Sequence, residues 1–187
     1  SLTIADRLRV GGIGNGTLDI ANGGADSSAW AEIDALYDST GVVTLNGIGS
    51  TWANSGDLDV GFLQRGTLTI THGGFLRVGG TLTIDYGEDG DSFINMASGG
   101  MLALFGQADG SLAEFLALVE GTDAIRYWNA AAGDWDDITN ATPGVDYDLA
   151  YITDGGALDG YTVLTVPEPA GLALLAVAGL GLLRRRR

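Results

Sequence analysis

Residues 55–74 read SGDLDVGFLQRGTLTITHGG and repeat residues 5–24, which read ADRLRVGGIGNGTLDIANGG. A shortened third copy, FLRVGGTLTI, follows at residues 75–84. Repetition at a fixed spacing is the sequence signature of a solenoid or a related repeat architecture. The two full copies share nine identical positions: Leu8/Leu58, Val10/Val60, Gly11/Gly61, Gly16/Gly66, Thr17/Thr67, Leu18/Leu68, Ile20/Ile70, Gly23/Gly73 and Gly24/Gly74.

Apolar residues alternate with polar ones inside each copy, as in Leu58-x-Val60 and Leu68-x-Ile70. A period of two places these side chains on one face of short strands, and the intervening glycines suit turns that need a positive φ. Because such short strands cannot bury a face alone, they are expected to stack in coils around a narrow core. The pattern therefore predicts a mainly β protein, with a short right-handed parallel β-solenoid over residues 1–106.

Other stretches supply further strands of this solenoid. Residues 41–52, GVVTLNGIGSTW, predict a strand between the two full copies, and Phe93–Ile94 and Leu102–Leu104 predict the last rungs. Residues 25–40 lack the pattern, and we interpret them as a looser insert, a loop or a small cap.

The combined pattern LxVGxxGxGTLxIxxGG, followed by GxVTLxGxGSxW, resembles the repeat shared by bacterial autotransporter passenger domains and PEP-CTERM proteins. The resemblance covers roughly residues 5–104, and the second copy departs from it where Gln64 replaces the glycine found at Gly14. It implies an exported protein of the cell surface or the extracellular matrix.

Residues 107–165 predict a small mixed cap over the end of the solenoid. Apolar residues at helical spacing indicate a helix at 111–120, with Ser111 as N-cap, Glu114 completing a capping box and Gly121 ending it. Short strands are expected at 124–128, 147–152 and 161–166. Such a cap protects the open end of a solenoid from edge pairing.

Residues 166–187 combine Pro167-Glu168-Pro169, the apolar stretch AGLALLAVAGLGLL at 170–183, and Arg184, Arg185, Arg186 and Arg187. As a helix, 170–183 would reach about 21 Å, short of the roughly 30 Å hydrocarbon core. A buried helix is therefore a rival interpretation. The apolar character on all faces and the arginines that follow favour a transmembrane helix with a membrane-stop signal.

The order of this tail resembles the PEP-CTERM sorting signal over its whole length. The resemblance implies that Pro167, Glu168 and Pro169 are recognised by an exosortase-like membrane processing enzyme, which removes the tail. It also implies that a signal peptide precedes Ser1 in the exported protein. The expected location is the cell envelope or the extracellular space, with a C-terminal membrane segment before processing.

Composition narrows the function. The net charge of −15 argues against binding to nucleic acid, and the absence of cysteine excludes disulfides and thiolate metal sites. His72 is the single histidine, and its position after a strand is that of a turn residue. We therefore expect a protein without catalytic residues. A carboxylate pair on a β-solenoid polysaccharide hydrolase or lyase remains a second alternative.

Two further patterns point to ligands. Asp85, Glu88, Asp89 and Asp91 supply oxygen ligands for a weak calcium site, although a solvated acidic loop accounts for them as well. Outward threonines at 67, 69 and 71 and at 81 and 83 suggest an ice-binding or polysaccharide-binding surface, and threonine is also simply a good strand residue. The main prediction is a structural or adhesive role in the envelope or the exopolysaccharide matrix.

Overall fold

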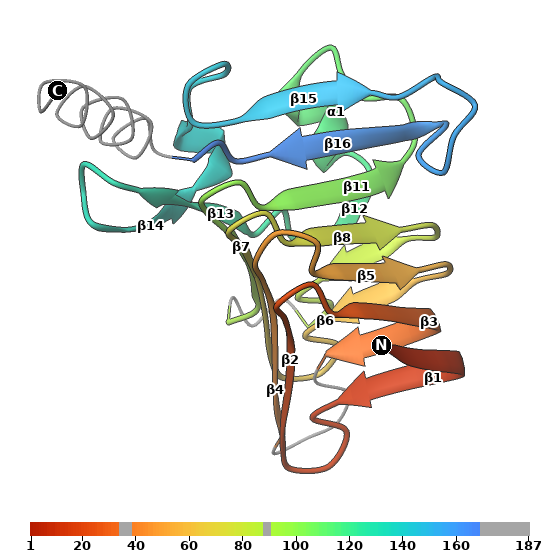
Figure 1. Ribbon diagram of the computed structural model, residues 1–187. Coiled ribbons are helices and arrows are strands. Elements are labelled where there is room, and N and C mark those ends of the chain that lie inside the picture. The colour runs from red at the N-terminus through yellow and green to blue at the C-terminus, as the bar shows by residue number, and fades with distance from the viewer. Residues whose placement is uncertain (34–38, 88–90, 169–187) are drawn as a thin grey trace, which may run out of the picture.

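The computed structural model describes residues 1–33, 39–87 and 91–168. Its strands form a β-solenoid of about four coils, which confirms the mainly β prediction (Figure 1). The strands before the cap are β1 Leu2–Val10, β2 Asn15–Ala21, β3 Ala25–Ile33, β4 Thr40–Asn46, β5 Thr51–Asn54, β6 Leu58–Val60, β7 Arg65–Thr71, β8 Phe75–Val78, β9 Leu82–Ile84, β10 Phe93–Met96 and β11 Met101–Phe105.

Each coil contributes one strand segment to each of three stacked ladders, which we call faces 1, 2 and 3. Face 1 holds the first halves of β1 and β3, then β5, β8 and β11. Face 2 holds the second halves of β1 and β3, then β6 and β9. Face 3 holds β2, β4, β7 and β10. All these pairings are parallel, so the same side-chain positions recur from coil to coil.

The spacing between the two full sequence copies corresponds to two coils rather than one. Leu8 pairs with Ala31, and Ala31 pairs with Leu58. The interpretation of residues 25–40 as a loose insert is therefore wrong where the structure describes them, because β3 is a full member of faces 1 and 2. The signal was hidden because two of the inward residues of β3, Ser28 and Ala31, are small, and only Ile33 is a large apolar side chain.

The third sequence copy is real, but its strands lie one face away from the positions that the repeat alignment predicts. Leu76 and Val78 stack on β5 in face 1, and Leu82 and Ile84 stack on Leu58 and Val60 in face 2. The motif of two apolar residues separated by one residue is the same on every face. Sequence similarity alone therefore cannot assign a strand to its face.

The core is a set of inward columns, one residue per coil. One column on face 3 runs Leu18, Val43, Leu68, Ile94. The last three are fully buried, and Leu18 in the first coil is only half-buried. Burial of an aliphatic side chain stabilises by about 1.5–3 kcal/mol, so the stacked columns are the main source of stability.

The corner between faces 3 and 1 is a type I′ turn in three coils. The central pairs Asn22-Gly23, His72-Gly73 and Ser98-Gly99 all have positive φ, and the backbone N–H of the next glycine donates to the carbonyl three residues earlier. His72 thus occupies a turn position where its φ is 52°.

The cap consists of α1 Leu112–Leu116, β12 Val119–Gly121, β13 Ile125–Asn129, β14 Asp134–Asp137, a 3₁₀ turn at Ile138–Asn140, β15 Asp148–Tyr151 and β16 Tyr161–Thr165. Ser111 caps α1 by accepting the backbone N–H of Glu114 at 3.2 Å, as predicted. The helix is shorter than expected, and Gly121 lies in β12 instead of ending it. Phe115 is fully buried and fastens the helix to the core.

The cap continues the solenoid rather than only covering it. β12 pairs in parallel with β9, and β13 pairs in parallel with β10, so both extend existing faces. The antiparallel strands β14 and β16 then pair with β13 and β11 and change the strand direction at this end. β15 pairs with β16 at the sheet edge.

The expected terminal helix at 170–183 lies outside the described residues, as do Pro169 and Arg184–Arg187. Within residues 1–33, 39–87 and 91–168, no helix is long and apolar enough to cross a membrane.

Candidate functional site

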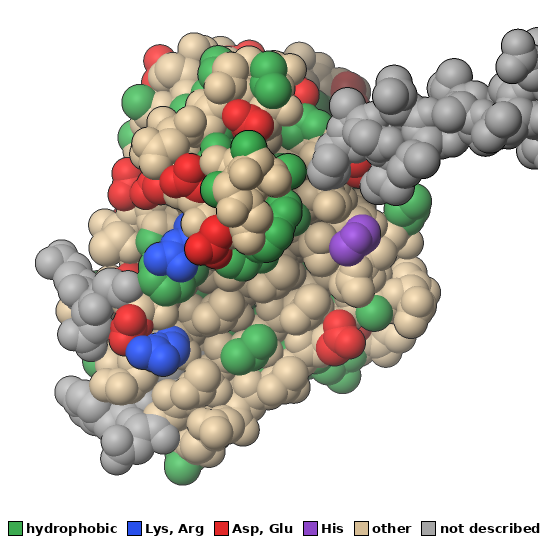
Figure 2. Space-filling view, turned by 90° about the vertical axis from the view of Figure 1, so that its left-hand side faces the viewer, with side chains coloured by type: hydrophobic (Ala, Val, Ile, Leu, Met, Phe, Trp, Pro, Cys, Tyr) green, Lys and Arg blue, Asp and Glu red, His purple; other side chains and the backbone are tan. Residues whose placement is uncertain are grey.

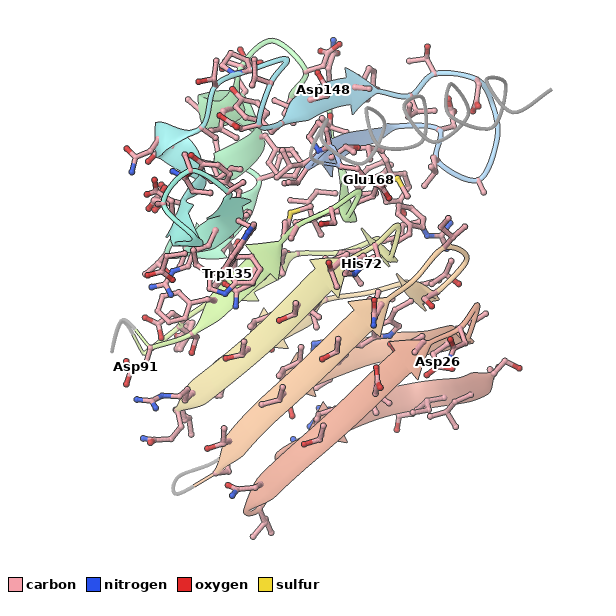
Figure 3. The ribbon with its side chains drawn as sticks, turned by 60° about the vertical axis from the view of Figure 1, so that its left-hand side comes forward. Asp26, His72, Asp91, Trp135, Asp148 and Glu168 are labelled. Carbon is pink, nitrogen blue, oxygen red and sulfur yellow. The ribbon has the colours of Figure 1, made fainter. Side chains whose placement is uncertain are left out.

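Face 3 presents a broad, regular outer surface of polar side chains. Alternate residues of β2, β4 and β7 point inward, so the residues between them point outward in aligned columns. Figure 3 shows these short side chains standing along the strands, with His72 at the end of β7. Six of the outward residues are threonines: Thr17, Thr40, Thr44, Thr67, Thr69 and Thr71.

This face carries few charges for a chain with a net charge of −15. Asp19 lies on β2, and Arg65 at the start of β7 is paired with Asp91 at 2.6 Å. Figure 2 views the face directly and shows mostly uncharged polar surface with isolated charged groups. Surface hydroxyls and amides without strong charge favour contact with uncharged polar ligands.

The threonines expected to form one array do not all share this face. Thr67, Thr69 and Thr71 point outward on face 3, and Thr44 extends their central column into the neighbouring coil. Thr83 instead belongs to β9 on face 2, where it is buried. The sequence repeat did not reveal Thr44, because its coil matches the others poorly.

Aromatic and cationic groups border face 3 at the cap. The Cζ atom of Arg126 lies 3.2 Å from the ring centroid of Phe93. Asn95 pairs with Arg126 across the ladder, and its Oδ1 atom is buried with no hydrogen-bond partner among the described residues. Figure 3 places Trp135 beside this end of the face. The polar face thus ends at an aromatic rim.

The hairpin of β13 and β14 holds this rim in place. Trp128 and Trp135 pair across it with ring centroids 5.3 Å apart in a T-shaped contact. Asp136 accepts hydrogen bonds from the side-chain amides of Asn140 at 3.0 Å and Asn129 at 3.2 Å. These bonds favour the charged form and lower the pKa of Asp136. The hairpin therefore keeps an ionised carboxylate at its base at neutral pH.

Face 2 carries a column of ionisable groups on its outer side. Arg9 and Glu32 form an ion pair, and Glu32 is only 6% exposed. Strand pairing places Asp59 of the next coil beside Glu32, and it places Thr83 of the following coil beside Asp59. Burial raises the pKa of Asp59, the Thr83 hydrogen bond opposes this, and nearby Glu32 adds to it. This column is the nearest feature to a carboxylate pair, and the sequence did not single it out.

The predicted sorting motif begins directly after the folded body. Val166 is 4% exposed, its N–H donates to the Gly100 carbonyl at 3.1 Å, and its carbonyl accepts the Gly99 N–H at 2.7 Å. Pro167 follows half-buried, and Glu168 is exposed. The predicted recognition residues therefore begin at Pro167, directly after the last residue that is hydrogen-bonded to the cap.

The calcium candidates are only partly described. Glu88 and Asp89 lie outside the described residues, Asp85 is buried, and Asp91 is paired with Arg65. In the described part of the chain, no three acidic or histidine side chains are grouped as a metal site would need. The ring Nδ1 of His72 lies 3.0 Å from the Thr71 hydroxyl, in the exposed turn.

The fold defines the class of this protein as a short, capped β-solenoid with a broad polar face. A scan against protein-family models and searches of curated proteins and of solved structures found no match.

Proposed function

We propose that this chain is a non-enzymatic protein of the bacterial cell surface or extracellular matrix. Face 3 would bind matrix polysaccharide and give the protein a structural or adhesive role. The observation that carries the proposal is the aligned array of outward threonines on a nearly uncharged face. Sugar hydroxyls exchange hydrogen bonds with such an array, and the threonine methyl groups contact the apolar faces of sugar rings.

The regular repeat supports a polymer rather than a small molecule as the ligand. Adjacent strands in a sheet lie about 4.8 Å apart, so face 3 offers the same groups again at each coil. A polysaccharide can contact several of these rows at once, and many weak contacts then add to a useful affinity.

The proposal includes a right-handed coil, the usual sense for parallel β crossovers.

Binding to purified matrix polysaccharide tests this role. Thr69→Arg places a long cation in the middle of face 3 and should reduce retention on the polysaccharide by about tenfold, through loss of close contact. Thr153→Arg is the matched control, because Thr153 is exposed in the cap away from face 3. Equal retention of the two variants, or none for the unmodified chain, would refute the proposal.

An ice-binding role is the alternative that the same array favours. Asp19, Val42 and Asn46 interrupt the threonine columns, which argues for the polysaccharide instead. Thermal hysteresis in a freezing assay, abolished by Thr69→Arg, would decide for ice.

Sorting by an exosortase-like membrane enzyme is the second part of the proposal. Its support is the Pro167-Glu168-Pro169 motif placed directly after the last residue held by the body. Changing the three residues to alanine in the native host should leave a larger, membrane-retained form. Unchanged size and location would show that the motif does not direct processing.

A further inference from the structure

A groove of about 510 Å³ lies where the chain leaves the cap, and we call it the exit groove. Its walls come from β13, from the turn that precedes β15, and from the segment after β16. The residues that matter here are Tyr127, Trp128, Val145, Asp146, Asp148 and Glu168. Figure 3 labels Asp148 and Glu168 at this cap end of the molecule.

Trp128 gives the groove an aromatic platform. It is 40% exposed although it is a large apolar side chain, and its T-shaped contact with Trp135 holds the ring in position. Val145, which is 67% exposed, extends the apolar surface. Exposed tryptophan on a concave surface is well suited to stacking against the apolar face of a ring.

Three carboxylates surround this platform. Asp148 and Glu168 are exposed, and within the described ranges the side-chain carboxylate of neither residue takes part in a hydrogen bond or an ion pair. Asp146 accepts the backbone N–H of Thr142 through one oxygen at 2.9 Å, which leaves its other oxygen available. No described arginine lines the groove. The groove therefore offers several acceptors and a negative charge that none of its described lining residues balances.

Tyr127 adds a hydroxyl group that has no hydrogen-bond partner in the described part of the chain. Its side chain is only 5% exposed and lines the groove, yet its hydroxyl makes no hydrogen bond to any residue that the structure describes. Burial raises the pKa of Tyr127, and the charges of Asp146 and Asp136 add to this, so the phenol stays protonated. It can both donate to and accept from a ligand.

We propose that the exit groove binds a protonated amino sugar, the 2-amino-2-deoxyhexopyranose unit of a cationic polysaccharide. The apolar face of the ring stacks on Trp128, and the ammonium group lies between Asp148 and Glu168. Ring hydroxyls hydrogen-bond to Tyr127 and Asp146. Charge complementarity selects the cationic sugar over its N-acetylated form, because acetylation removes the positive charge and adds bulk at the same position.

Calorimetric titration with glucosamine oligomers tests the proposal, with N-acetylglucosamine oligomers of the same length as the comparison. The glucosamine oligomer should bind, and the acetylated oligomer should bind at least about tenfold more weakly. Asp148→Asn with Glu168→Gln should weaken glucosamine binding by about tenfold or more. Trp128→Ala should do the same, and Trp128→Phe should retain most of the affinity.

Asp6→Asn with Glu120→Gln is the matched control, since it removes two negative charges, as the test variant does, from exposed positions outside both face 3 and the exit groove. It should leave the affinity for glucosamine oligomers unchanged within about twofold. A loss of affinity equal to that of the groove variant would show that only the overall charge of the chain matters, and would overturn the proposal. Equal binding of the acetylated oligomers, or of a lysine oligomer, would overturn the assignment to an amino sugar. Thr69→Arg should leave groove binding intact, so the exit groove and face 3 can fail independently.

Discussion

Replacing Gly74 by alanine tests whether the repeat requires glycine at this position because neighbouring coils stack closely. Gly74 is the residue that closes the type I′ turn after His72-Gly73, and its own φ is not positive. A Cβ atom there would lie 2.5 Å from the carbonyl oxygen of Leu45 and 2.9 Å from its carbonyl carbon. Leu45 belongs to the preceding coil, so the clash falls on rigid backbone.

The magnitude follows from this overlap. Ordinary contacts begin near 3.4 Å, so the two coils must separate by roughly 0.9 Å at this corner. Overpacking of this kind costs about 1–3 kcal/mol, and weakening the adjacent bond from Phe75 N–H to the Ser50 carbonyl adds about 1 kcal/mol. We therefore expect Gly74→Ala to lower the free energy of unfolding by about 2–4 kcal/mol. The melting temperature should fall by roughly 5–15 °C.

Gly24→Ala is the matched control, because Gly24 closes the same turn in the first coil. The closest atom to its Cβ would be the Ala21 oxygen at 3.1 Å, within its own turn, and the other near atoms belong to Ile20 and Ala21 rather than to a preceding coil. The cost should stay below about 1 kcal/mol, since alanine also restricts the unfolded chain. Thermal unfolding followed by circular dichroism near the strand band measures both variants. Equal melting temperatures for the two would refute the stacking argument.

Three further predictions concern the core and face 2. Asp59→Asn should raise the melting temperature at pH 7, because a carboxyl group whose pKa is raised by folding destabilises the folded protein above that pKa. The difference in melting temperature between the variant and the unmodified chain should vanish below about pH 3.9, which melts over a series of pH values would measure. Asn54→Asp should cost more than about 3 kcal/mol in denaturant titration, because the fully buried Asn54 amide donates to the Gly56 and Asp57 carbonyls at 2.8 Å, and a carboxylate cannot. Leu68→Ala should cost about 2.7–5 kcal/mol by the same titration, since Leu68 is fully buried between Val43 and Ile94, and a smaller loss would mean that the coils collapse into the cavity.

The strands that could be predicted from the sequence are those whose inward residues are large. Leu58, Leu68 and Leu82 could be assigned to strands because leucine and isoleucine that alternate with other residues are typical of a strand with one buried face. β3 escaped because Ser28 takes an inward place, where its hydroxyl accepts the Trp52 indole N–H and donates to Asn54. Hydrogen-bonded polar side chains can fill an inward position of a solenoid as leucine does. Such positions leave no alternation of apolar residues in the sequence.

The two proposed binding sites also differ in how far the sequence predicts them. Outward Thr67, Thr69 and Thr71 could be identified from alternation alone, because the inward residues fix which way they point. The exit groove could not, since Trp128 and Glu168 meet only through the strand pairing of β13 and β16 with the solenoid. Local periodicity has no information on contacts between segments that far apart in the chain.

The position of the proposed sorting motif links the sorting proposal with the proposal for the exit groove. Val166 is buried and hydrogen-bonded to Gly99 and Gly100, so a processing enzyme that binds the chain at Pro167 would contact the folded cap. Glu168 belongs to both the motif and the exit groove, which means that a bound amino sugar would cover part of the recognition segment. Ligand binding and tail removal are then expected to compete. Slower processing in the presence of glucosamine oligomers, restored by Asp148→Asn, would show that competition directly.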